Sequence, residues 1–242
     1  MRLRKLFIGI TLLCIALAFM ESAVVVYLRE ILYPEGFSFP LAKFEGHLAV
    51  TEILREVSTL VILVAIAIIT AKKFSEGFAW FVYCFAIWDI FYYVFLKALI
   101  DWPASLFDWD ILFLLPVTWT GPVISPLIVC ITMITLMAVI LYFYSRGVDT
   151  KIKPVEWIMM IAGAVIVIVS FTWDYSGYIL ERYSLSDIWN LPQDSSILDY
   201  ASGYIPRRFN WWLFAAGNLI IVSAIILLYR RLRRLVPQSF LH

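Results

Sequence analysis

The sequence predicts an all-α integral membrane protein with six transmembrane helices, and three observations lead to this prediction. Of the 242 residues, 63% are apolar and 15% are charged. A soluble domain has roughly 45–50% apolar residues and about 25% charged residues. The apolar residues gather in long segments of about the 20 residues that a helix needs to cross a bilayer. Lysine and arginine gather between alternate segments, as they do in the cytoplasmic loops of membrane proteins.

The first expected helix covers about residues 6–28 and follows a basic start. Its apolar run continues past Glu21, which makes it too long for the apolar core of a signal peptide. We therefore expect an uncleaved transmembrane helix. Two prolines and a glycine in the segment 33–40 end this helix, and the second helix is expected at about 46–70.

The third expected helix, at about 78–100, is rich in aromatic residues. The loop that follows is both acidic and aromatic, which is typical of a membrane interface. The next apolar run, about 111–144, is longer than a single span and is interrupted by Pro116, Gly121, Pro122 and Pro126. We expect a proline-broken piece at 111–119, interfacial or re-entrant, and then a fourth helix at about 122–144.

The last two helices are expected at about 155–179 and 209–229, separated by an extracytoplasmic loop at 180–207. Residues 1–242 are expected to form one transmembrane domain. Twelve of the 19 basic residues lie at one set of helix ends, and the positive-inside rule places those ends in the cytoplasm. Both termini are then cytoplasmic, as six spans require. The protein is expected in the cell membrane, the inner membrane of an organism that has two.

The opposite half of the molecule is expected to be acidic, because most of the aspartates and glutamates lie there. Such a surface attracts cations. At about 1.5 Å per residue along a helix, Glu21, Arg55, Glu56 and Asp89 fall at similar depths. Charged groups inside a membrane are costly and commonly mark a functional site. If their helices face one another, these four residues form a polar cluster.

Further polar residues extend this cluster. Glu52 lies one helical turn before Arg55 and Glu56. Asp89, Tyr93 and Lys97 recur every fourth residue and form one line along the third helix. On the fifth helix, a Trp-Asp pair is repeated at Asp174. The candidate substrate-binding or ion-binding residues are therefore Glu21, Glu52, Arg55, Glu56, Asp89, Tyr93, Lys97 and Asp174.

Three functions are consistent with this set. The first is an outward-facing pocket of carboxylate, arginine and tyrosine side chains that binds a cation, protons or a small polar substrate for transport. The second is a membrane enzyme that acts on a lipid-linked substrate with a hard divalent cation. Its metal ligands would be Glu21, Glu56 and Asp89, since carboxylate oxygens suit such ions. The third is a non-catalytic subunit in which the charges form a structural ion-pair network.

Other cofactors and partners follow from the composition. Heme is not expected, because the only histidines are His47 and the C-terminal His242. The three cysteines lie inside apolar runs, which favours a packing role. The net charge of +1 gives no information on nucleic acid, but no basic nucleic-acid-binding motif is visible, so a nucleic-acid partner is not expected. The expected partner is the lipid bilayer, with other membrane subunits or a second copy of the chain as further candidates.

Overall fold

The structure is a computed structural model of the chain, and it describes residues 2–43, 46–115, 117–184, 187 and 195–236. It contains six helices that are long and apolar enough to cross a membrane, which confirms the prediction of an all-α membrane fold. They are α1 (Arg2–Leu32), α2 (Gly46–Thr70), α3 (Phe74–Ile100), α4 (Ile124–Tyr144), α5 (Pro154–Leu180) and α8 (Trp211–Arg233).

Many large apolar side chains on these helices point away from the protein. Ile68 and Ile69 of α2 are 71% and 83% exposed, and Ile158 of α5 is 66% exposed. An apolar surface of this extent is unfavourable in water. Lipid chains cover such a surface, and helices satisfy their own backbone hydrogen bonds within a bilayer.

Local signals explain why the helices begin and end close to the predicted residues. The Glu56-bearing helix α2 matches the prediction, whereas α3 begins four residues earlier than expected. At the start of α3, the carboxylate of Glu76 accepts a hydrogen bond from the backbone N–H of Lys72 at 2.9 Å. This bond satisfies a donor next to the first turn of the helix. In α5, Pro154 occupies the first turn, where its missing N–H costs nothing.

The segment before α4 contains a β-hairpin, which the prediction of an all-α chain did not include. Strands β1 (Trp109–Phe113) and β2 (Trp119–Pro122) pair antiparallel, with Asp110 opposite Gly121. Prolines disfavour a helix here, and the aromatic and β-branched residues of this segment favour strands. A side chain at Gly121 would meet the ring of Phe209, which lies 3.0 Å from the ideal Cβ position.

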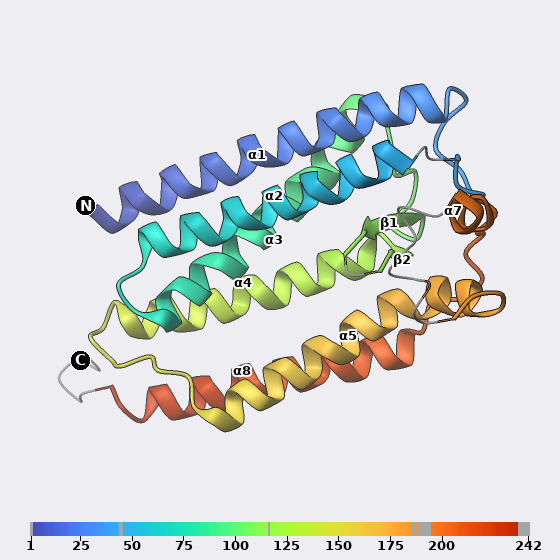
Figure 1. Cartoon of the computed structure of the whole chain (residues 1–242). Helices are drawn as coiled ribbons and strands as arrows, with labels where there is room; N and C mark the ends of the chain where they lie inside the picture. The colour runs from blue at the N-terminus through green and yellow to red at the C-terminus, as the bar shows by residue number, and fades with distance from the viewer. Residues whose placement is uncertain (1, 44–45, 116, 185–186, 188–194, 237–242) are drawn as a thin grey trace.

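The helix α3 lies at the centre of the first half of the bundle, where it packs against α1, α2 and α4. The helices α1 and α2 each pack mainly on α3 rather than on each other. The second half is the pair α5 and α8, in which α8 packs on α4 and α5 packs on strand β2. Figure 1 shows that α1 begins and α8 ends at the same end of the bundle, while the hairpin lies toward the opposite end.

The helices α5 and α8 cross with their backbones in direct contact. A Cβ atom at Gly163 of α5 would lie 2.7 Å from the carbonyl oxygen of Gly217 and 2.6 Å from Ile221 of α8. A Cβ atom at Gly217 would lie 2.8 Å from the carbonyl oxygen of Gly163. Small residues allow such close approach between membrane helices, where dispersion contacts replace the hydrophobic effect as the main attraction.

At the end of the bundle where the chain starts, a buried ion pair joins α5 to α8. Arg231 donates to both carboxylate oxygens of Glu156, at 2.7 and 2.8 Å, and also to the carbonyl oxygen of Lys151. At the opposite end, the expected loop 180–207 contains the short helix α7 (Ser195–Ser202). Residues 185–186 and 188–194 of this loop lie outside the described residues.

Candidate functional site

A cavity of about 680 Å³ lies between α1, α2, α3, the β-hairpin and α7, in the half of the bundle away from the start of α1. We call it the α1–α2 cavity. It lies where α1 and α2 both pack on α3 instead of on each other. Most of its wall is apolar, and six aromatic side chains contribute to it: Tyr33, Phe37, Trp88, Tyr92, Phe113 and Tyr175.

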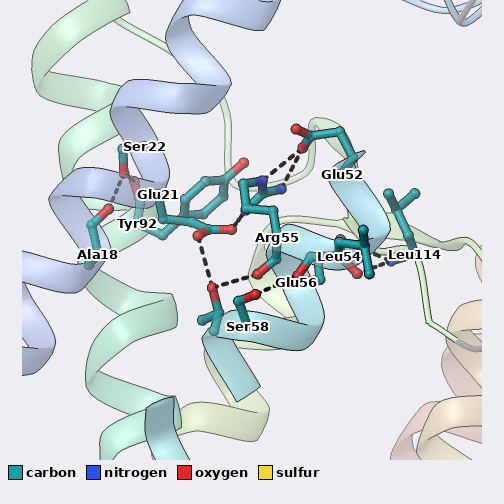
Figure 2. A network of polar contacts seen from close by, with 11 residues as sticks. Ala18, Glu21, Ser22, Glu52, Leu54, Arg55, Glu56, Ser58, Tyr92 and Leu114 are labelled. Atoms are coloured by element: carbon teal, nitrogen blue, oxygen red, sulfur yellow. Dashed lines mark hydrogen bonds and ion pairs between the residues drawn. The ribbon is translucent and has the colours of Figure 1, made fainter. Parts of the chain in front are cut away.

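One charged network on the cavity wall is centred on Arg55 (Figure 2). The guanidinium of Arg55 forms an ion pair with Glu21 of α1. Its Nε and Nη2 also donate to Oε2 of Glu52, at 2.8 and 2.7 Å. The hydroxyl of Thr59 donates to Glu21 at 3.3 Å. Because Glu52, Arg55 and Thr59 lie three or four residues apart, they share one face of α2; Arg55 and Thr59 bind Glu21 of α1, and Glu52 binds Arg55.

Glu56 and Asp89 line the same cavity but have different partners. Both carboxylate oxygens of Glu56 accept from the backbone N–H of Leu114, at 2.9 and 3.1 Å, beside the end of β1 (Figure 2). Asp89 accepts from the thiol of Cys130 on α4 at 3.2 Å. Within the described residues, neither carboxylate has an ion-pair partner. Their hydrogen-bond partners are thus neutral donors, a backbone N–H and a thiol.

A second charged network is centred on Arg29 and Asp110, which the sequence did not single out. Nη2 of Arg29 donates to Asp110 at 2.9 Å, and the hydroxyl of Tyr93 donates to the other carboxylate oxygen at 3.3 Å. The guanidinium of Arg29 also lies against two rings, 4.3 Å from the centroid of Phe37 and 3.8 Å from that of Trp102. In the sequence, Arg29 stands near a helix end and Asp110 in a loop, so both resembled ordinary interfacial charges.

Three of the predicted site residues do not line the α1–α2 cavity. Tyr93 lies behind the wall and binds Asp110. Lys97 forms an ion pair with Asp101, at 2.7 Å, because the two residues are one helical turn apart. This ion pair is exposed. Asp174 of α5 accepts from the hydroxyl of Tyr204 at 2.7 Å and from two backbone N–H groups, and so holds the segment after α7.

The cavity does not gather the proposed metal ligands into one set. Among the residues that the structure describes, no three histidine, cysteine, aspartate or glutamate side chains come close enough to hold a metal ion. Of the three proposed ligands, Glu21 is paired with Arg55, Glu56 accepts a backbone N–H, and Asp89 accepts a thiol. Each carboxylate is thus directed toward its own protein partner.

Burial raises the pKa of Asp110 from 3.8 to about 6, although the charge of Arg29 and two hydrogen bonds act in the opposite direction. Between about pH 4 and pH 6, the folded chain retains a proton on Asp110 that the unfolded chain has released. The contribution of this group to stability is therefore complete below about pH 4 and is lost as the pH rises to about 6.

This pH dependence can be measured on the protein in lipid nanodiscs. We expect the Tm of wild type, relative to that of Asp110→Asn, to fall as the pH rises from 4 to 7. The variant is the control, because it lacks the titrating carboxyl while all other acids are kept. Parallel pH profiles of the two proteins would contradict the prediction.

Comparison with known proteins gives the chain no relatives: no family model, no curated protein and no solved structure matches it.

Proposed function

We propose that the α1–α2 cavity binds an organic cation with an apolar body, and that this binding serves transport. The observation that carries the proposal is the pair Glu56 and Asp89. Both carboxylates line the cavity, and neither has a cationic partner among the described residues. A positively charged ligand group would supply the missing charge. Carboxylates inside a membrane are costly unless they are compensated or used.

The balance of charge along the wall favours a cation over an anion. The lining residues include five carboxylates and two guanidiniums: Glu21, Glu52, Glu56, Asp89, Asp110, Arg29 and Arg55. The two arginines already have carboxylate partners. An anion would have to displace one of these carboxylate partners or bind beside it. A cation would meet Glu56 and Asp89, which have no ion-pair partner among the described residues.

The remaining wall supports a ligand with an apolar body. Ligand sites are commonly apolar clefts with a few well-placed polar groups. The faces of aromatic rings attract cations, by about 0.5–2 kcal/mol depending on how far the cation is desolvated. Trp88 and Tyr92 line the cavity within one helical turn of Asp89, so a cation at Asp89 would lie beside aromatic rings. A small hydrated metal ion would make poor use of such a wall.

The distribution of basic residues supports an outward-facing cavity. Arg230, Arg231 and Arg233 lie in the last turn of α8, at the end of the bundle opposite the hairpin (Figure 1). By the positive-inside rule that end is cytoplasmic, and the cavity then belongs to the outer half. Both cytoplasmic termini and a re-entrant placement of segment 111–119 remain predictions.

Tetraphenylphosphonium and tetraphenylborate provide a direct test, because they have nearly the same shape and opposite charge. We expect nanodiscs that contain the protein to bind the phosphonium above the background of empty nanodiscs, and the borate at background. Replacing a compensating carboxylate by its amide removes an interaction of about 1.5–3 kcal/mol. Glu56→Gln and Asp89→Asn should therefore each weaken phosphonium binding by about tenfold or more.

The matched control is Asp174→Asn, which removes a carboxylate from the same half of the protein but outside the cavity, and it should leave binding unchanged. Equal binding of the two probes, or equal binding by wild type, Glu56→Gln and Asp89→Asn, would overturn the proposal. Where binding is confirmed, uptake of the phosphonium into proteoliposomes tests the transport step, which requires uptake to fall in Glu56→Gln.

A further inference from the structure

The side chain of Arg29 is buried and yet incompletely bonded. It is 9% exposed and lines the α1–α2 cavity. Nη2 donates to Asp110, but Nη1 has no hydrogen-bond partner among the described residues. Arginine is always charged and presents five N–H donors in a planar fork. One branch of this fork is therefore used by the protein, and the other is free.

A free, buried donor of this kind calls for an acceptor. Leaving a buried donor unsatisfied costs about 1–3 kcal/mol, and more when the donor is charged. Native proteins contain few such groups, and each one requires a specific explanation. Because Arg29 lies on the cavity wall, the nearest source of an acceptor outside the protein is whatever occupies the cavity.

The surroundings of Arg29 hold the guanidinium in a fixed position. Its faces are occupied by the rings of Phe37, from the loop after α1, and Trp102, from the loop after α3. Its Nη2 edge is held by Asp110 of β1. Contacts from three separate segments fix the orientation of the fork, as a binding site requires. Nη1, which has no hydrogen-bond partner among the described residues, is left as a donor for a ligand.

We propose that Nη1 of Arg29 binds an acidic oxygen of the cavity's ligand, so that the ligand is a zwitterionic amphiphile. Its cationic group would compensate Glu56 and Asp89, its phosphate or carboxylate oxygen would bind Arg29, and its apolar part would lie along the cavity wall. This inference rests on the proposed function, because it adds an acidic group to the organic cation proposed there. Guanidinium groups bind such oxygens through charge-assisted hydrogen bonds.

Two alkyl probes separate this inference from the proposed function. Decyltrimethylammonium and decylphosphocholine share a ten-carbon chain and a trimethylammonium group, and only the second carries a phosphate. Binding is measured below the micellar concentration on protein-containing nanodiscs, with empty nanodiscs subtracted. We expect wild type to bind decylphosphocholine about tenfold more tightly than decyltrimethylammonium. Phosphocholine without a chain should compete only weakly, because it does not use the apolar wall.

Two variants assign the preference to Arg29. Arg29→Lys keeps a positive charge beside Asp110 but lacks the second branch of the fork, so we expect it to bind the two probes equally. Asp110→Asn keeps Arg29 and removes the competing carboxylate, so the preference for decylphosphocholine should persist or increase. If Arg29 had only a structural role, both variants would weaken the binding of the two probes by the same factor. This result would overturn the inference.

The two levels of the proposal fail differently. If decyltrimethylammonium does not bind, or binds equally to Glu56→Gln, the proposed cation site is wrong. If it binds through Glu56 while wild type shows no preference for the phosphocholine probe, the cation site stands and the role of Arg29 is wrong. Competition by free phosphocholine at the same concentration as decylphosphocholine would also contradict the inference, because it would identify a water-soluble ligand.

Discussion

Replacing Arg55 with glutamine is expected to lower the free energy of unfolding by about 3–5 kcal/mol, the range found when one partner of a buried ion pair is removed. Arg55 compensates two carboxylates at once, Glu21 of α1 and Glu52 of α2. Both are buried, at 8% exposure each. Without the guanidinium, two buried acids would face each other across the cavity wall with no positive charge between them.

The loss can be measured by denaturant titration in mixed micelles. Lys97→Gln is the matched control, because it breaks an ion pair of the same length, 2.7 Å, that is exposed to solvent. We expect that variant to lose less than about 1 kcal/mol. Adding Glu21→Gln to Arg55→Gln should restore part of the stability, since one uncompensated charge is removed. Similar losses for Arg55→Gln and Lys97→Gln would show that Arg55 has no special role.

Replacing Gly163 with alanine is expected to destabilise the protein by about 1–3 kcal/mol, the range for overpacked sites. Within a single helix the same change is favourable, since alanine is preferred to glycine by about 1 kcal/mol. At Gly163 the added Cβ would lie 2.7 Å from the backbone of α8. Backbone atoms move less easily than the end of a side chain, so α5 and α8 would have to separate.

Gly177, on the same helix α5, is the control for this prediction. A Cβ atom there meets nothing within 4 Å, so Gly177→Ala should leave the free energy of unfolding unchanged or raise it by up to about 1 kcal/mol. The two substitutions are chemically identical, but only the one at Gly163 should lower the free energy of unfolding. Equal effects in the denaturant titration would contradict the backbone contact between α5 and α8.

The helices could be predicted from the sequence because lipid imposes a simple rule. Each span needs about 20 apolar residues, and breaks at proline, glycine and charge delimit them. The second span was expected at 46–70 and is α2, Gly46–Thr70. The hairpin was missed because Trp109–Phe113 is short and, apart from Asp110, apolar, and such a run has no period that separates a strand from a helix end.

The site was partly predictable for a similar reason. Depth along a helix follows from counting residues, which is why Glu21 and Arg55 were expected at one level, and the structure places them in contact. The spacing of four residues allowed Lys97 to reach Asp101, but counting gives no rotation of a helix relative to its neighbours, so it did not show that Tyr93 lies behind the cavity wall. It also gave no information on Asp110, whose position depends on the hairpin, or on Arg29, whose partners come from three different loops and strands.

The packing of α1 and α2 on α3 has a consequence for how the protein is made. A ribosome delivers α1, α2 and α3 to the membrane in that order, so α2 reaches the bilayer before the helix it packs against has left the ribosome. During that interval, Glu21 is the one described partner of Arg55 outside α2 that is already present. We therefore expect Glu21 to assist the insertion of a helix that carries three charged residues, and glycosylation-based insertion assays of chains in which α3 is replaced by a polar linker should detect this effect.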